Sequence, residues 1–210
     1  MNQTVVTQFL GSELLPEENR IESARYHLIP CPLEKTVSYG SGTAGGPSAI
    51  LAASQQLERS PICSHGIFTH PPIDGDSEHL DCLIALKQRV IEVVSRGAFP
   101  VTLGGEHSLT WGAVAGMTEA LGEKVGILQV DAHADLRLDY EGFRHSHASV
   151  MRLLAREGHR IASLGVRAIC SEEREARNEH SVFFRDGEEL VRGEVEEVEL
   201  PRSEEHTSEL

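Results

Sequence analysis

The chain has 210 residues, 40% of them hydrophobic, and a formal net charge of −14. This length can bury one core, so we expect a single α/β domain, and the acidic balance argues against nucleic acid as a partner because phosphate binding requires a basic face. No apolar run approaches the length of about 18 residues that a membrane span needs, and no secretory signal opens the chain. We therefore expect a cytoplasmic protein that does not associate with membranes.

Hydrophobic periodicity predicts strands that alternate with helices after a polar segment at the amino terminus. Residues 1–24 are expected to form an N-terminal arm that wraps the surface or contacts a neighbouring subunit. Strands are predicted over 26–30, 67–69, 98–103, 125–129 and 160–166, and helices from near Pro47 and over 81–95, 108–124, 151–157 and 172–178. This order is typical of α/β proteins.

The segment Val130-Asp131-Ala132-His133-Ala134-Asp135 carries the most informative pattern. In an extended chain, Asp131, His133 and Asp135 face the same side, so we expect the two carboxylates and the imidazole to converge. Carboxylates that lie close together raise each other's pKa unless a cation sits between them. Oxygen ligands combined with imidazole favour manganese, iron(II) or zinc over calcium or copper(I). The alternative is a strand end with solvated charges.

A second group, Gly104-Gly105-Glu106-His107-Ser108, follows the strand predicted over 98–103. Paired glycines let the backbone turn sharply, so His107 emerges at a strand end. Strands joined by a crossover helix lie parallel, with their carboxyl ends at one edge of the sheet. We therefore expect His107 to meet the ligands of residues 131–135, and four ligands exceed what one mononuclear site with an open position needs. A second metal ion is favoured.

The pairing of Gly-Gly-Glu-His-Ser with Asp-Ala-His-Ala-Asp resembles the ureohydrolases, the arginase and agmatinase family of binuclear manganese amidinohydrolases. Residues 36–43, Gly46-Pro47 and 135–149 are similar to the agmatinase branch. The resemblance implies a three-layer α/β/α fold with a mostly parallel sheet, incomplete at the C-terminus. It places a partial ureohydrolase domain at residues 25–201.

The resemblance also implies which residues bind metal. His107, Asp131 and Asp135 are expected to bind one Mn²⁺, and His133 a second, with Asp131 bridging both ions. A metal-bridging hydroxide would then attack the guanidinium carbon of the substrate, and urea would leave.

Three further residues are expected near the reaction. His147, in the context Ser-His-Ala-Ser, matches the family's active-site histidine, which contacts substrate or relays protons to the leaving amine. Glu106 and Ser149 are expected to support a ligand or to line the substrate rim.

The resemblance fails at the carboxyl end of the chain. The family has a third motif, Ser-x-Asp-x-Asp-x-x-Asp-Pro, and a later glutamate that grips the guanidinium, and the region after Arg185 contains neither. Residues 202–210 look like a translated sequencing-library adapter. We therefore expect a non-native tail at 202–210 and an amino-terminal fragment of a longer enzyme. The alternative is a short disordered acidic tail of a complete protein.

One glycine pattern points elsewhere. Residues 40–45 satisfy G-x-G-x-x-G, the dinucleotide-binding pattern, but no preceding strand is adjacent and no strand ends in an acidic residue about 20 positions later. We interpret this segment as a loop at the rim of the active site.

The expected function is hydrolysis of agmatine to putrescine and urea, a reaction of polyamine biosynthesis. Arginase or another guanidino-acid ureohydrolase is the alternative in the same class, and a non-catalytic truncated metal-binding fragment is the alternative from another class. We expect a small cationic guanidino substrate and a homo-oligomer, and we expect this fragment itself to be inactive.

Overall fold

The computed structural model describes residues 7–193, which form two compact units. The amino-terminal unit contains residues 7–123 and 145–147, and the carboxy-terminal unit contains residues 124–144 and 148–193. The domain predicted over 25–201 thus extends across both units. Its end at residue 201 and the tail at 202–210 lie outside the described residues.

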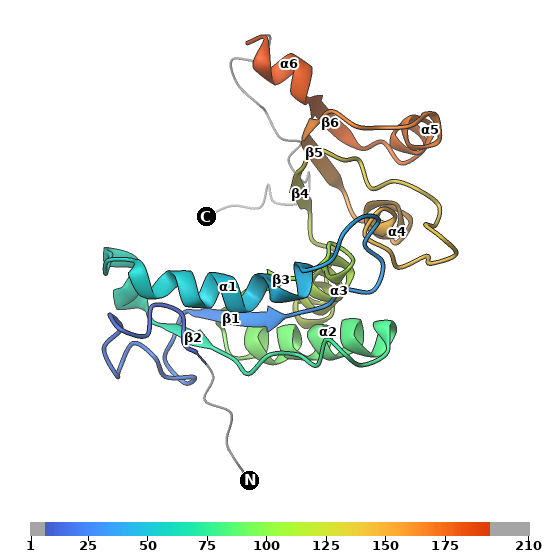
Figure 1. Ribbon diagram of the computed structural model, residues 1–210. Helices are drawn as coiled ribbons and strands as arrows, with labels where there is room; N and C mark the ends of the chain where they lie inside the picture. The colour runs from blue at the N-terminus through green and yellow to red at the C-terminus, as the bar shows by residue number, and fades with distance from the viewer. Residues whose placement is uncertain (1–6, 194–210) are drawn as a thin grey trace, which may run out of the picture. The chain divides into compact units, whose positions relative to one another are not determined.

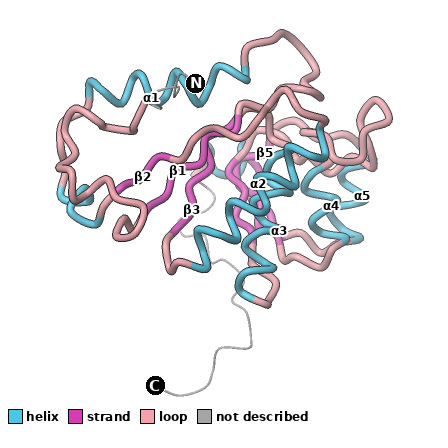
Figure 2. The backbone as a smooth tube through the Cα atoms, turned by 90° about the horizontal axis from the view of Figure 1, so that it is seen from below, coloured by secondary structure: helices cyan, strands magenta, loops and turns pink. Residues whose placement is uncertain are grey.

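The amino-terminal unit is built on a parallel sheet with the strand order β2-β1-β3. The strands are β1 (Tyr26–Cys31), β2 (Ile67–Thr69) and β3 (Phe99–Gly104), which run side by side in Figure 2. The central strand β1 is buried beyond its first residue. The apolar run at residues 28–31 fits this burial, because helices cover both faces of a parallel sheet.

Helices cover both faces of this sheet. They are α1 (Gly46–Ala53), α2 (His79–Ser95) and α3 (Leu109–Leu121), and short 3₁₀ turns lie at Thr43–Gly45, Ser54–Gln56 and Pro61–His65. Both α1 and α2 contact β1 and β3, and Figure 1 shows them on opposite sides of β1. The predicted α/β/α layering is therefore present in this unit.

The core of this unit lies between β1 and the apolar stripe of α2. Leu83, Leu86, Val90 and Val93 recur at helical spacing and are fully buried. They pack in one cluster with Ile29 and its neighbours in and after β1. The amphipathic pattern that predicts this helix from the sequence therefore also identifies the face that it buries.

The described part of the N-terminal arm packs on its own unit. The backbone N–H of Phe9 donates to Thr69 Oγ1 at 2.9 Å, and that of Leu10 donates to Ser54 Oγ at 2.9 Å. The Leu10 side chain is buried with Leu28 and Leu51. Residues of this segment thus contact their own unit, and both the N-terminal arm and its contact with another subunit stay predictions.

The carboxy-terminal unit has a second parallel sheet, with the strand order β4-β5-β6. The strands are β4 (Ile127–Val130), β5 (Ile161–Val166) and β6 (Phe183–Asp186), and the helices are α4 (Val150–Arg156), α5 (Ser171–Glu179) and α6 (Gly187–Val191). The sequence analysis missed β6 and α6. A capping box between Asp186 and Glu189 marks the start of α6, and this D-x-x-E spacing is a signal that could have found it.

All the strand pairs of the described residues are parallel, which confirms the predicted α/β class with its mostly parallel sheet. The ladders pair β3 with β1 and β4 with β5. The expectation that β3 and β4 share one sheet edge therefore stays a prediction.

The described residues show neither a membrane-spanning helix nor a disulfide. Between residues 7 and 193, no helix combines the length and the hydropathy that crossing a bilayer demands. The cysteines at positions 31, 63, 82 and 170 are free thiols, and all but Cys170 are buried. The described cysteines form no disulfide.

The contact between α2 and α3 yields a prediction. A Cβ on Gly116 would lie 2.7 Å from the carbonyl oxygen of Lys87 and 2.7 Å from Val90 Cβ. Gly116→Ala should therefore lower the free energy of unfolding by about 1–3 kcal/mol, despite alanine's higher helix propensity. Gly45→Ala is the matched control, because nothing lies within 4 Å of its Cβ and its φ is −76°. Urea unfolding followed by circular dichroism measures both, and equal stabilities would contradict the close packing.

A buried pair of histidines connects β1 to the segment after β2. His27 Nδ1 lies 2.9 Å from His70 Nε2, and Arg89 Nη1 lies 3.1 Å from His70 Nδ1. A guanidinium only donates, so His70 Nδ1 accepts and its Nε2–H donates to His27. Burial, together with the charge of Arg89 and smaller effects of His27 and Arg96, lowers the pKa of His70 to about 4.

This pair should make the unit sensitive to acid. Between about pH 4 and pH 6.5 the unfolded chain binds a proton at residue 70 that the folded chain does not, so stability falls as the pH falls through this window. We expect a loss on the order of 1–3 kcal/mol between neutral pH and pH 4.5. His70→Gln keeps a donor and an acceptor but cannot titrate, and it should flatten this dependence in urea unfolding measured across the window. A slope that the substitution does not change would rule out His70 as its source.

Candidate metal-binding and active-site residues

Asp131 and Asp135 follow β4, which ends at Val130. The extended geometry predicted over residues 131–135 is wrong. Asp131 Oδ1 accepts the backbone N–H of His133 at 2.9 Å, and Asp135 adopts a left-handed φ of 52°. An aspartate readily bonds the backbone two residues on and tolerates the left-handed region, so these residues bend the chain.

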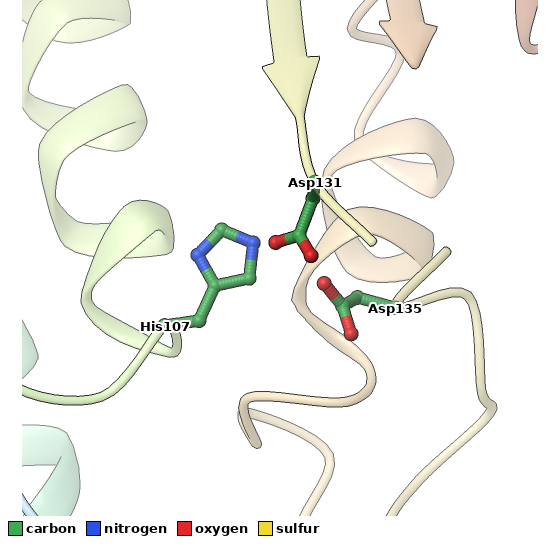
Figure 3. A group of neighbouring side chains, drawn as sticks. All are labelled: His107, Asp131 and Asp135. Atoms are coloured by element: carbon green, nitrogen blue, oxygen red, sulfur yellow. The ribbon is translucent and has the colours of Figure 1, made fainter. Parts of the chain in front are cut away.

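The bent chain nevertheless brings the two carboxylates together. An oxygen of Asp131 and an oxygen of Asp135 lie within 4.8 Å of each other, and Figure 3 shows the two groups turned toward each other. Gln129 Nε2 donates to Asp135 Oδ2 at 3.2 Å, and Ser163 Oγ donates to Gln129 Oε1 at 2.5 Å. Gln129 of β4 thus binds Asp135, and Ser163 of β5 holds Gln129 in place. The sequence analysis missed Gln129, although a polar residue inside an apolar strand was the signal.

The charge at this pair is unbalanced. Asp135 is buried, with 7% of its surface exposed, and its pKa is raised to about 7 by burial and then by the charges of Asp131 and Glu173. A divalent cation between the carboxylates would remove this repulsion, and carboxylate oxygens are suitable ligands for Mn²⁺. The donor set therefore fits a metal ion.

The His133 side chain lies beside Asp131. Its Nδ1 is 3.5 Å from Asp131 Oδ1, and its side chain is 67% exposed. Among the described residues, the group of mutually close ligand atoms includes both aspartates but not His133. Convergence of the three side chains on a single point is thus not observed. Asp131 is the residue that both of the others approach, which is what a bridging ligand requires.

His107 belongs to the amino-terminal unit and follows the two glycines after β3. A Cβ on Gly105 would lie 2.4 Å from the carbonyl oxygen of Leu33, so only glycine lets the chain pass this close to the end of β1. His107 Nδ1 then lies 3.0 Å from the hydroxyl of Thr110, in the first turn of α3. This contact orients the imidazole. Its predicted meeting with the aspartates, which belong to the other unit, stays a prediction.

Glu106 is a buried anchor, with 3% of its surface exposed. Its carboxylate accepts the backbone N–H groups of Lys35 and Thr36 and the hydroxyls of Thr36 and Ser108, at 2.5–2.6 Å. Burial alone would raise the pKa of Glu106, but the hydrogen bonds from Ser108, Thr36 and Lys35 outweigh it and lower the pKa. Glu106 thus ties the segment after β1 to the segment after β3.

His147 reaches the same anchored segment. Its Nδ1 lies 3.2 Å from Thr36 Oγ1, its backbone N–H donates to Thr36 Oγ1 at 3.1 Å, and its Nε2 lies 2.8 Å from Ser38 Oγ. The preceding His145 packs edge-on against Trp111, with ring centroids 5.0 Å apart. The sequence analysis named His147 but missed Thr36 and Ser38 as its partners. Two hydroxyls directly before a glycine-rich run were the available signal.

Ser149 is buried, and its hydroxyl donates to the backbone carbonyl of Arg144 at 2.8 Å. In this position it closes the loop that carries His147. Its predicted part at the substrate rim stays a prediction.

The Glu34 carboxylate accepts hydrogen bonds from the backbone of the glycine-rich loop at residues 40–45. Glu34 accepts the backbone N–H groups of Gly42 and Ala44 at 2.8–2.9 Å and the hydroxyl of Thr43 at 3.0 Å. These hydrogen bonds lower the pKa of Glu34, and the bond from the Ala44 backbone has the largest effect. Amides that would cradle a phosphate in a dinucleotide site are therefore already paired with Glu34, which argues against such a site. The place of this loop at the rim of the active site stays a prediction.

Comparison with known proteins relates this chain to one family. The sequence matches the Arginase family over residues 24–206. It is 35% identical to an N(1)-aminopropylagmatine ureohydrolase of Synechocystis sp., over 83% of this chain and 60% of that protein. It is 30% identical to an agmatinase of Bacillus subtilis, over 84% of this chain and 63% of that protein. The chain thus spans about three fifths of the length of these relatives.

Solved structures share the fold. An agmatine ureohydrolase of Thermoplasma volcanium is 30% identical, with a TM-score of 0.69 over 84% of this chain and 64% of that chain. An arginase of Medicago truncatula is 26% identical, with a TM-score of 0.72 over 81% of this chain and 59% of that chain. A Trypanosoma cruzi formiminoglutamase determined with Mn²⁺ is 21% identical and supports the fold alone, with a TM-score of 0.76 over 88% of this chain and 66% of that chain. The family match, which extends through both units, shows that this chain belongs to the arginase family.

Proposed function

We propose that the protein containing this chain is a metal-dependent ureohydrolase that removes urea from agmatine and leaves putrescine. The observation that carries the proposal is the close, partly buried pair Asp131 and Asp135 in a chain of the arginase family. Relatives at 30% identity or more that are named agmatinase or agmatine ureohydrolase support the substrate class.

A second substrate has a specific observation in its favour. Four relatives named N(1)-aminopropylagmatine ureohydrolase are 31–35% identical to this chain, and the agmatinases from Bacillus subtilis and Pyrococcus horikoshii are 30% identical. Both substrates carry the same guanidinium at one end and differ in the tail. We therefore keep N(1)-aminopropylagmatine as the alternative, ahead of arginine and guanidino acids.

We propose that His107, Asp131 and Asp135 hold one Mn²⁺, and that His133 holds a second ion with Asp131 shared. Burial, together with the charges of Asp131 and Glu173, raises the pKa of Asp135, and this cost of ionisation supports a cation beside it. Two such ions would lower the pKa of water so that it can attack the guanidinium carbon near neutral pH. His147 would accept a proton from the reacting water and return it to the leaving amine.

We also propose that residues 1–210 alone have little activity. The sequence contains no Ser-x-Asp-x-Asp-x-x-Asp-Pro segment, and two more carboxylates would be needed to complete the coordination of two ions. Cytoplasmic location and homo-oligomerisation remain part of this proposal.

Metal binding can be tested through stability. Asp135→Asn removes a buried charge next to Asp131, yet asparagine tolerates the φ of 52° and still accepts from Gln129. The folded-state pKa of about 7 means that Asp135 costs stability as the pH rises above the ordinary value of 3.8, so at pH 8 the variant without metal should be more stable by about 1–3 kcal/mol. Thermal unfolding should show that Mn²⁺ raises the Tm of the unaltered chain but not that of the variant.

The exposed Asp139 provides the control for this experiment. Asp139→Asn removes the same charge from the same unit and should keep the response to Mn²⁺. If Mn²⁺ stabilised Asp135→Asn as much as the unaltered chain, Asp135 would not be a ligand.

Activity is tested by urea release from the complete gene product with Mn²⁺. We expect the highest kcat/KM for agmatine or N(1)-aminopropylagmatine, and lower values for arginine and guanidinobutyrate. His147→Asn should lower kcat by roughly 10²–10⁴-fold because it removes a proton-transfer group. Preference for arginine would overturn the substrate, and robust turnover by residues 1–210 alone would overturn the proposal that this segment is incomplete.

A further inference from the structure

The hydrogen bonds around Glu106 have a fixed direction. Oε2 accepts the backbone N–H groups of Lys35 and Thr36, at 2.5 Å and 2.6 Å. Oε1 accepts the hydroxyls of Thr36 and Ser108, at 2.6 Å and 2.5 Å. Glu106, Thr36 and Ser108 are all buried, so water does not compete for these positions. The single hydroxyl proton of Thr36 is therefore committed to Glu106.

Because the Thr36 hydroxyl donates its proton to Glu106, its role in the contacts with His147 is determined. Thr36 Oγ1 lies 3.1 Å from the backbone nitrogen of His147 and 3.2 Å from its Nδ1. A hydroxyl has one proton to donate and two lone pairs to accept with. Because the proton points to Glu106, both contacts with His147 must be accepted by Thr36. The Nδ1 atom of His147 must therefore carry a proton.

The other ring nitrogen is then the basic one. In a neutral imidazole with a proton on Nδ1, Nε2 has the lone pair. Ser38 Oγ lies 2.8 Å from Nε2 and can donate to it. Ser38 is exposed while Thr36 is buried. The hydrogen-bond partner of Nε2 therefore lies at the exposed end of this chain of hydrogen bonds, and the partner of Nδ1 lies at the buried end.

We propose that Glu106, acting through Thr36, is a positioning residue that fixes His147 as its Nδ1–H tautomer and presents Nε2 as the proton-accepting atom. The catalytic consequence rests on the proposed function: Nε2 takes a proton from the reacting water and gives it to the nitrogen of the leaving amine. The tautomer itself is a property of residues 36, 106 and 147 and can be measured without turnover.

The test is ¹H–¹⁵N NMR of the histidine rings in the ¹⁵N-labelled 210-residue chain, without metal. Long-range couplings distinguish a protonated ring nitrogen from one with a lone pair, and His147→Gln identifies the signal by its disappearance. At roughly pH 9, well above the ordinary histidine pKa of about 6.5, we expect His147 as the Nδ1–H tautomer. The Nε2–H tautomer in the unaltered chain would overturn the proposal.

Glu106→Gln provides the sharpest variant. The amide oxygen can still accept the N–H groups of Lys35 and Thr36, but the amide nitrogen then donates to Thr36 Oγ1. The Thr36 hydroxyl must turn its proton toward His147 Nδ1, so His147 should convert to the Nε2–H tautomer. Retention of Nδ1–H in a folded Glu106→Gln chain would show that Glu106 does not set the tautomer.

Substitutions at Thr36 test the same step where Glu106→Gln fails to fold. Thr36→Ser keeps the hydroxyl and should keep Nδ1–H, whereas Thr36→Val has the same shape without it and should make Nε2–H the major form. Ser38→Ala is the matched control, because it removes a partner of Nε2 but leaves the link to Glu106, and it should keep Nδ1–H. Identical tautomers in Thr36→Ser and Thr36→Val would overturn the proposal. If these shifts occur but the complete enzyme releases no urea, the proposed function fails while the role of Glu106 stands.

Discussion

Burial of the Asp135 carboxylate beside a second carboxylate, Asp131, is the constraint on which the candidate site depends. Asp135 is held within 4.8 Å of Asp131 by its own left-handed backbone and by Gln129 beneath it. Burial and the neighbouring charges raise its pKa to about 7, so the folded unit without metal retains an unfavourable charge. Such a pair fits a cation, since the same energy that costs stability without an ion would favour binding one.

A second carboxylate, that of Glu106, is also buried, but hydrogen bonds stabilise its charge. Glu106 is more deeply buried, yet four donors surround it and its pKa is lowered. It joins the segment after β1 to the segment after β3, and through Thr36 it orients His147. Burial thus has different consequences for the two acids. Hydrogen bonds stabilise the charge of Glu106, which in turn positions its neighbours, whereas the charge of Asp135 is stabilised too little and would favour a bound cation.

Reasoning from the sequence identified most of the elements but less of the local geometry. Helix α2 and strand β1 were predictable because their apolar periodicity follows directly from which faces they bury. The bend at residues 131–135 was not, because alternating spacing predicts a common face only while the chain stays extended. The short elements β6 and α6 carry too few apolar residues for a periodic signal, and only the capping box marks them.

The sequence by itself determined the class of the protein and indicated its candidate metal ligands, because two short motifs and the alternation of strands and helices depend on residue type and spacing alone. The tertiary structure decided which hydroxyls and amides those residues meet. Thr36 and His147 are 111 positions apart, and Gln129 and Ser163 are 34 apart. Contacts of this kind arise only when separate segments pack together, so no local pattern specifies them, and they hold Gln129 beside Asp135 and orient His147.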